Sequence, residues 1–509
     1  MPSNCSVAPK DVFSTIEKLL LRDGFDIVID MEQSKGSHIV DSASGAKWLD
    51  FYTFFASSPF GMNHPKLDNP EFKEKIFRAA INKVANSDIY TQEMAEFIKT
   101  FGEVAVPEGY NHVFFIDYGT LAVENTFKVA MDWKVQKLLQ KGKVTPGEAY
   151  NGRKGTKIMH FNEAFHGRSG YTLSVTNTND PNKHQRFAKF TDWPRIINPK
   201  ISFPLEDHIG EVEWLEAQAI KQIKQVLMDD PDGVAAVIIE TIQGEGGDNH
   251  FRTEFFQKLR QICDENEMLL IFDEVQCGMG ITGKMWAWEH HAPVKPDLFS
   301  FGKKAQICGL IAGPRVDEVK DNCFKVSSRI NSTWGGTVVD MVRAQKYLEI
   351  YRDEKVLDYV SNVAGPALYA GLKELESEFP GYIRNVRGKG LMCAYDICCP
   401  ELRDKFLKEC HKNNMLILGC GSNTVRFRPH PVALVVPSGA GRAGGEHSAV
   451  GAGRFAEIFF VFCKRAGAVE EDQRNVGMER EQRGDVVRLL VSDFSVETAG
   501  AARAFYRIP

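Results

Sequence analysis

Residues 269–309 read LLIFDEVQCGMGITGKMWAWEHHAPVKPDLFSFGKKAQICG, and this stretch decides the fold. Two short apolar runs, 269–272 and 298–301, are typical of strands buried in a parallel sheet. The first run ends on Asp273, and the second leads to Lys303. Because open α/β sheets bind ligands beyond the carboxyl ends of their strands, we expect both side chains at one edge. An acid that holds a pyridinium nitrogen protonated, beside a lysine that forms a Schiff base, is the protein side of pyridoxal phosphate chemistry.

Other interpretations of the same stretch stay open. Strands that end in acids are common, and a Lys-Lys pair is usually solvated surface. Residues 278–283 match G-x-G-x-x-G, and residues 278–285 nearly match a nucleotide-binding loop. The first motif lies far past the strand end without a clear helix behind it, and the second has Met285 where Ser or Thr would ligate magnesium. His290 and His291 lack the spacing of metal ligands, so no metal site is predicted.

Composition limits the class of protein. A chain of 509 residues is too long for one core, so two or more domains are expected. With 43% apolar and 25% charged residues and a net charge of −5, a nucleic-acid or membrane partner is not expected. The eleven cysteines include no C-x-x-C pair, which favours free thiols in a reducing compartment. The N-terminus resembles neither a signal nor a transit peptide, so a cytoplasmic location is predicted.

Strands and helices alternate between about residues 110 and 310, which predicts an α/β fold with a largely parallel sheet covered on both sides. The apolar run 112–116 leads through Gly119 and Thr120 into a long helix. Such a helix start offers free N–H groups and a favourable dipole to a phosphate, although Gly-Thr is also an ordinary helix start. Thr253 is predicted to cap a later helix.

Two loops carry further candidate groups. Phe165 and Arg168 lie close together after a predicted strand, a pattern that suits stacking on a flat ring and binding of a carboxylate. In the alternative, Phe165 belongs simply to the core. The strand 234–239 ends on Glu240, and the glycine-rich loop after it bears a second acid, Glu245.

Seven segments together resemble the class III aminotransferases, which are pyridoxal phosphate enzymes of fold type I. They read FFIDYGTLAVENTFKVAMDWK, AFHGRSGYTLSVTNT, QGEGGDNHFRTEFF, LLIFDEVQCGMGITG, FGKKAQICG, RINSTWGG and TVRFRP. The resemblance covers about residues 10–431. It implies a large pyridoxal-phosphate-binding domain (71–336) with a mostly parallel, seven-stranded-type sheet, and a smaller α+β domain formed by residues 1–70 and 337–431.

The resemblance also assigns cofactor contacts. Lys303 would be the Schiff-base lysine and Lys304 a bystander. Asp273 would pair with the pyridinium nitrogen. The other contacts would be Gln276 on the ring hydroxyl side, Phe165 on the ring face, Gly119 and Thr120 at the phosphate, and Thr333 at the phosphate of the other subunit's cofactor. The last contact implies a homodimer.

For substrates, the resemblance implies transfer of the ε-amino group of L-lysine to 2-oxoglutarate, a reaction of lysine catabolism. The products would be 2-aminoadipate 6-semialdehyde, which cyclises to piperideine-6-carboxylate, and glutamate. Arg168 would bind the distal carboxylate of both substrates, and Arg426 the α-carboxylate of 2-oxoglutarate. Glu245 would neutralise Arg426 during the lysine half and then swing away, with Asn331 nearby. Lys303 would act as general base and acid.

The chain departs from the family pattern in several places. Tyr118 stands where glycine is usual before the phosphate turn, Thr241 where proline is common, and His430-Pro431 replaces the usual proline-rich entrance to the last helix. Residues 432–509 hold a stretch dominated by Gly, Ala and Arg and a single lysine. We interpret them as a divergent tail, either a flexible segment or the product of a wrong frame or an unspliced intron.

Three alternative functions remain. Another ω-aminotransferase of the class, such as a 4-aminobutyrate aminotransferase, would share the lysine, the aspartate and the switchable arginine. A nucleotide-dependent enzyme would use the 278–283 motif. A catalytically impaired homologue would act only as a binding partner.

Overall fold

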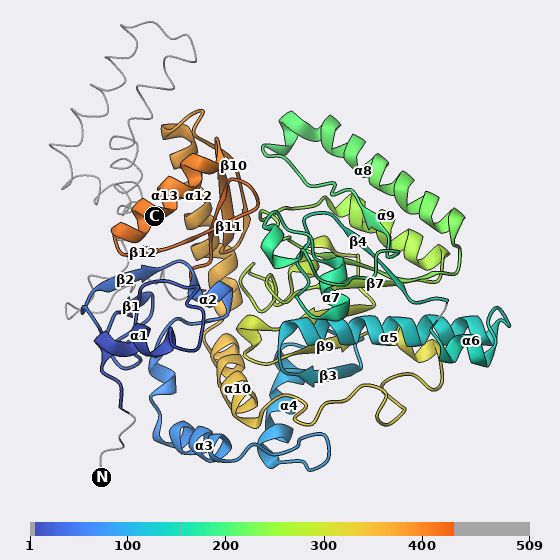
Figure 1. The fold of residues 1–509 in the computed structure, drawn as a ribbon, viewed down its shortest axis with the longest axis horizontal. Helices are drawn as coiled ribbons and strands as arrows, with labels where there is room; N and C mark the ends of the chain where they lie inside the picture. Colours follow the sequence, from blue (N-terminus) through green and yellow to red (C-terminus); the bar gives the residue numbers. More distant parts are fainter. Residues whose placement is uncertain (1–5, 153, 432–509) are drawn as a thin grey trace, which may run out of the picture.

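A computed structural model describes residues 6–152 and 154–431, and its main feature is a seven-stranded sheet (Figure 1). The strands lie in the order β3-β9-β8-β7-β6-β4-β5. Their bounds are β3 His112–Ile116, β4 Lys157–Phe161, β5 Arg195–Ile196, β6 Val234–Glu240, β7 Leu269–Asp273, β8 Leu298–Phe301 and β9 Cys308–Ala312. Strands β5, β4, β6, β7 and β8 pair in parallel, whereas β9 is antiparallel to both of its neighbours. The predicted, mostly parallel α/β sheet is confirmed.

The exception, β9, has a local cause. The chain reverses directly after β8 in the short 3-10 turn Lys303–Ala305, and the next residue, Gln306, has a left-handed φ of 62°. This turn is too short for a crossover helix, which a parallel connection needs. The tight reversal also fixes the backbone of Lys303 at the sheet edge.

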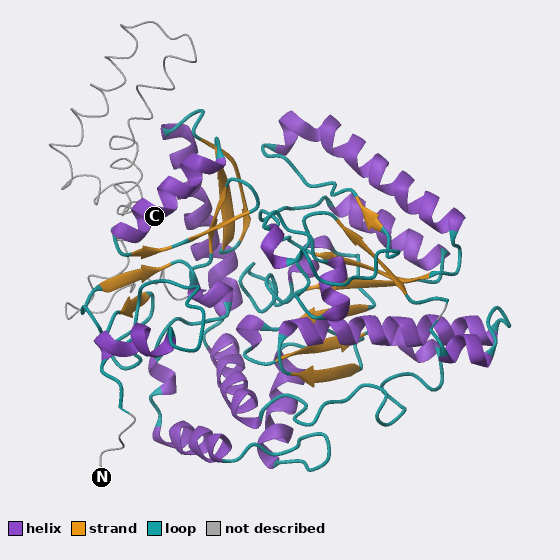
Figure 2. Ribbon diagram, viewed as in Figure 1, coloured by secondary structure: helices purple, strands orange, loops and turns teal. Residues whose placement is uncertain are grey.

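Both faces of the sheet are buried, as a parallel sheet requires (Figure 2). In β6, Ala236 and Ile238 pack on one side together with α5 (Gly119–Gln140). Val237 and Ile239 pack on the other side, in a cluster that draws on four helices. These are α4 Gln92–Val104, α8 Leu205–Asp229, α9 Thr253–Glu265 and α10 Val338–Asp353. Shorter helices in this part are α3 Pro70–Ile81, α6 Pro146–Tyr150 and α7 Gly170–Val175.

A second, antiparallel sheet has the order β10-β11-β14-β13. Its strands are β10 Ile383–Lys389, β11 Met392–Ile397, β13 Leu418–Cys420 and β14 Thr424–Phe427. Helices α12 Gly365–Glu378 and α13 Pro400–Lys412 contribute to its core, and the short α11 Val356–Tyr359 precedes them. A third, small sheet joins the two ends of the described chain: β1 His38–Val40, β2 Lys47–Asp50 and β12 Met415–Leu416 (Figure 1).

Several local predictions were wrong. The spacing of Val12, Ile16, Leu19 and Leu20 predicts one helix over residues 11–22. The structure has only α1 (Val12–Ile16) there, and Leu19 and Leu20 are 92% and 65% exposed. Their periodicity therefore finds no packing partner within the described chain. Thr253 is the first residue of α9 and makes no cap; its hydroxyl instead lies 3.0 Å from His291 Nδ1.

Among the described residues, no helix is long and apolar enough to cross a membrane. The predicted divergent tail, 432–509, lies outside the described residues.

Candidate active site

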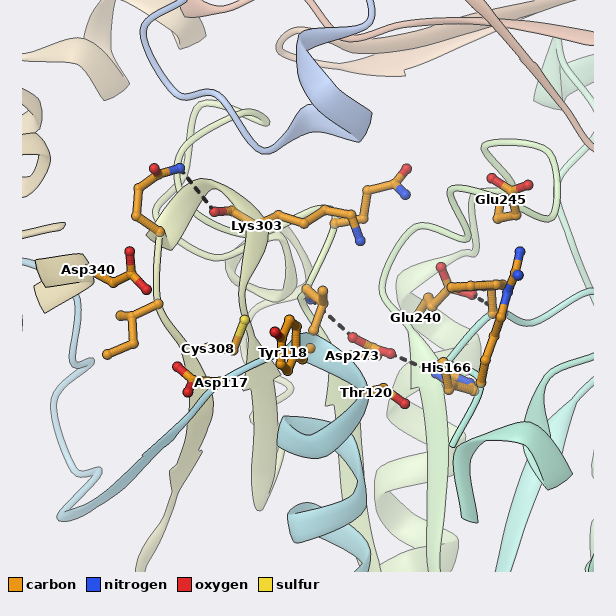
Figure 3. Close-up of a pocket in the computed structure, with 18 of the residues that line it drawn as sticks. Asp117, Tyr118, Thr120, His166, Glu240, Glu245, Asp273, Lys303, Cys308 and Asp340 are labelled. Carbon is orange, nitrogen blue, oxygen red and sulfur yellow. Dashed lines mark hydrogen bonds and ion pairs between the residues drawn. The ribbon is translucent and has the colours of Figure 1, made fainter. Parts of the chain in front are cut away.

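Asp273 and Lys303 lie at one edge of the sheet. Strands β7 and β8 pair in parallel with Asp273 opposite Ser300, and Lys303 follows at the end of β8. Both line a cavity of about 660 Å³ (Figure 3). The cavity is also lined by most of the other predicted groups, namely Gly119, Thr120, Phe165, Arg168, Glu245 and Gln276.

Asp273 is held in a fixed orientation. Its Oδ1 accepts hydrogen bonds from the Ser300 hydroxyl (3.0 Å) and the Val275 N–H (3.1 Å). Its Oδ2 lies 2.8 Å from Nδ1 of the buried His166 (Figure 3). Sequence reasoning missed His166 as a site residue, although it directly follows Phe165. The pair suits an acid that must stay ionised beside a protonated ring nitrogen.

Lys303 has the environment of a nucleophilic amine. Burial lowers its pKa below the ordinary value, and the nearby Asp273 carboxylate opposes this shift. A lysine amine that loses its proton more easily is a better nucleophile and general base. The neighbouring Lys304 is not solvated. It is buried, its Nζ donates to the carbonyls of Ala56 (3.1 Å) and Gln276 (2.7 Å), and burial lowers its pKa to about 7.

The start of α5, which lines the cavity, suits a phosphate. Helix α5 begins at Gly119, where an added Cβ would lie 2.8 Å from Val275, so packing selects glycine. The Thr120 hydroxyl lies 2.8 Å from Ser169 Oγ and 2.7 Å from Thr172 Oγ1. The N-terminus of a long helix, with its unpaired N–H groups and nearby hydroxyls, is a suitable anion site.

Tyr118, the departure noted in the sequence, stands at the N-cap of α5 with φ +69° and ψ +134°. That conformation favours glycine. Although the residue lines the cavity, its side chain is 74% exposed in the described chain. The departure from glycine therefore appears as backbone strain.

Glu240, which ends β6 directly opposite Asp273, organises the middle of the site. Its Oε1 accepts from the Phe165 N–H (2.9 Å) and its Oε2 from the Gly244 N–H (3.1 Å). Burial raises the pKa of Glu240 to about 7. Its position at the end of a strand was the signal that could have identified it.

The substrate end is dominated by charge. Arg426, on β14 of the second sheet, places Nη1 2.8 Å from Glu245 Oε2. The other oxygen, Oε1, accepts a hydrogen bond from Lys183, a residue that sequence reasoning did not single out. Arg168 is exposed and also lines the cavity. The site thus offers two arginines, one paired with an acid and one exposed at the cavity.

Gln276 is fixed by a buried ion pair. Its Oε1 accepts from Arg428 Nη2 (3.0 Å), and Arg428 Nη1 donates to Asp248 Oδ2 (2.7 Å). Asn331 and Thr333, by contrast, are exposed and do not line the cavity of the same described chain.

The nucleotide-binding interpretation of residues 278–283 is wrong. A Cβ on Gly280 would lie 2.6 Å from Tyr351, and one on Gly283 would collide with Ser361. A 3-10 turn, Ala287–His291, follows instead of a crossover helix. These glycines permit close packing of the loop on neighbouring segments and leave no room for a phosphate.

Comparisons with known proteins agree with this geometry. A sequence profile of the family described as Aminotransferase class-III matches residues 22–436. An L-lysine-epsilon aminotransferase of Mycobacterium tuberculosis is 45% identical over 422 residues, which cover 83% of this chain and 91% of the relative. A solved lysine aminotransferase from M. tuberculosis is 41% identical with a TM-score of 0.81, over 90% of this chain and 99% of that one. A 4-aminobutyrate aminotransferase of Schizosaccharomyces pombe is 33% identical over 412 residues, which cover 79% of this chain and 85% of the relative.

Proposed function

The chain belongs to the class III aminotransferases, and we propose that it transfers the ε-amino group of L-lysine to 2-oxoglutarate. The products are 2-aminoadipate 6-semialdehyde, which cyclises to piperideine-6-carboxylate, and glutamate. One observation carries the proposal within the family: a buried arginine, Arg426, is paired with Glu245, which lines the cavity that holds Lys303. This arrangement suits an enzyme that takes a substrate with one carboxylate and then one with two.

The residues present fit pyridoxal 5'-phosphate, the cofactor of this family. The fit rests on the fixed carboxylate of Asp273 beside His166, the buried amine of Lys303, and the anion site at the start of α5. Gly119 and Thr120 would hold its phosphate, Phe165 its ring face, and Gln276 its hydroxyl side. When bound, the cofactor supplies an electron sink for the charge that develops on the reacting carbon.

Three side chains of the protein have separate roles in the reaction. Asp273 would hold the proton on the ring nitrogen, because Ser300 and His166 fix the orientation of its carboxylate. Lys303 Nζ takes the proton from the ε-carbon of lysine and returns it later. Arg168 binds the carboxylate that is remote from the reacting carbon in both substrates.

After Glu245 releases Arg426, the arginine binds the α-carboxylate of 2-oxoglutarate. During the half-reaction with lysine, Arg426 stays paired with Glu245, so no unpaired charge remains buried beside the ε-amine. Asn331 lies near the substrate in this proposal.

The proposal extends to assembly and location. Thr333 is exposed and does not line the cavity of its own described chain, which supports the proposal of a homodimer with Thr333 at the partner's cofactor phosphate. A cytoplasmic location is part of the same proposal.

The direct test is glutamate formation by the purified protein with pyridoxal phosphate, L-lysine and 2-oxoglutarate. We expect glutamate from lysine, none from the Lys303→Ala variant, and a slower reaction with 4-aminobutyrate as donor. A faster reaction with 4-aminobutyrate than with lysine would favour the alternative, a 4-aminobutyrate aminotransferase. A protein that binds the cofactor but makes no glutamate from any donor would be an impaired homologue.

A further inference from the structure

Glu245 is shared between two cations. Its Oε2 lies 2.8 Å from Arg426 Nη1, and its Oε1 accepts a hydrogen bond from Lys183 Nζ. The Arg426 side chain is only 4% exposed, whereas that of Lys183 is 23% exposed. The carboxylate therefore bridges a buried partner and a partially solvated one. Arg426 and Lys183 together hold the pKa of Glu245 below its ordinary value, although burial alone would raise it.

The backbone around Glu245 cannot move far. A Cβ on Gly244 would collide with Gln276, and one on Gly246 would collide with the carbonyl of Glu163, so the loop is closely packed on both sides. The Glu245 carbonyl accepts a hydrogen bond from the Gly421 N–H (3.0 Å). Any exchange of partners by Glu245 is thus a rotation of its side chain about a fixed Cα.

Lys183 is held on a short structured segment. It ends the 3-10 turn Pro181–Lys183, which Asp180 caps through the Asn182 N–H (3.0 Å). The other acid within reach of Lys183 Nζ is Asp180, whose Oδ2 lies 3.8 Å away and is more exposed than Glu245. The ammonium group is therefore directed chiefly toward Glu245.

We infer that Lys183 is a positioning residue for substrate exchange: it retains the Glu245 carboxylate when a substrate dicarboxylate takes Arg426. This inference rests on the proposed function, in which Arg426 alternates between Glu245 and the α-carboxylate of 2-oxoglutarate. A planar guanidinium binds a carboxylate through two parallel hydrogen bonds, so the incoming group displaces Glu245 Oε2. Oε1 stays on Lys183, and the displaced acid keeps a cationic partner.

Without Lys183, the displaced carboxylate would be left largely buried and unpaired, which is costly. Glu245 would then compete more strongly for Arg426. Dicarboxylates should bind more weakly, whereas lysine, which leaves the Glu245–Arg426 pair intact, should be little affected. The asymmetry between the two half-reactions distinguishes this role from a merely structural one.

The test compares Lys183→Met with the wild-type holoenzyme. The first readout is the Kd of glutarate, an unreactive dicarboxylate, by calorimetry, with the monocarboxylate hexanoate as reference ligand. We expect the Kd of glutarate to rise about tenfold, the size of one hydrogen bond to a charged group, and that of hexanoate to stay within about twofold. The second readout is the KM of each substrate. The KM for 2-oxoglutarate should rise about tenfold, and the KM for lysine should stay nearly constant.

Three further variants complete the design. Lys183→Arg should restore most of the glutarate affinity, because it restores the cation. Lys189→Met, a nearby partially buried lysine outside the cavity, is the matched control and should change neither ligand's Kd. In a Glu245→Gln background, where no charge is displaced, Lys183→Met should have no effect on glutarate.

The inference is overturned if Lys183→Met weakens both ligands equally, leaves glutarate binding unchanged, or has the same effect in the Glu245→Gln background. Failure of the proposed function gives a different result. If the wild type makes no glutamate from lysine but its glutarate affinity still depends on Lys183, the substrate assignment fails and the role of Lys183 stands.

Discussion

Replacement of Tyr118 by glycine should stabilise the protein. Tyr118 has φ +69° and ψ +134° at the start of α5, a conformation that costs a side-chain-bearing residue about 1–3 kcal/mol. Its side chain is 74% exposed, so its removal loses little buried surface. Glycine adds about 0.4–1 kcal/mol of conformational freedom to the unfolded chain, which offsets part of the gain. We therefore expect the free energy of unfolding to rise by about 1 kcal/mol.

The assay is urea unfolding of the cofactor-free protein, followed by circular dichroism. Tyr118→Ala retains the Cβ and hence the strain, so it should gain nothing. Tyr150→Gly removes a still more exposed tyrosine (92%) at the end of helix α6, where its φ is not left-handed, and should give no gain in stability. The reasoning is refuted if Tyr118→Gly is no more stable than Tyr118→Ala.

Two further predictions concern buried carboxylates. Burial raises the pKa of Asp50 to about 6, so its contribution to stability is full only well below pH 4 and is lost as the pH rises through 6. Between pH 4 and 8 the wild type should lose about 2.5 kcal/mol more unfolding free energy than Asp50→Asn, and parallel pH profiles would contradict this. Asp248→Asn leaves the buried Arg428 without its counter-charge and should cost about 3–5 kcal/mol in urea unfolding. The pair of Arg403 with Asp404, whose side chain is 59% exposed, is the control: Asp404→Asn should cost less than about 1 kcal/mol, and equal losses would refute the argument.

The sequence predicted strands best where both faces are buried. The predicted runs 234–239 and 269–272 match β6 and β7 to within one residue, because both are continuous apolar stretches that end at an acid. Strand β10 was missed, since Arg384, Arg387 and Lys389 interrupt its apolar pattern and a register shift separates the first two. Leu19 was misassigned because a helical period says nothing about whether a partner surface exists.

The site divides in the same way. The proximity of Asp273 and Lys303 was predictable, because it depends only on two adjacent parallel strands ending at one edge. The contacts of Lys183 with Glu245 and of Arg428 with Asp248 join segments far apart in the chain. No local sequence pattern predicts such contacts, so only the folded structure shows which charged side chains pair.

Three carboxylates within one cavity have different roles because their partners differ. Glu240 accepts hydrogen bonds from the backbone N–H groups of Phe165 and Gly244, and burial moves its pKa to about 7, so it serves to fix the loop backbones. Asp273 faces a histidine and a hydroxyl that hold it in one orientation, which suits a permanent counter-charge. Glu245 faces two cations on separate segments, so it can release one and keep the other. A carboxylate that must exchange partners needs a second cation, which is why the role of Glu245 cannot be understood from Arg426 alone.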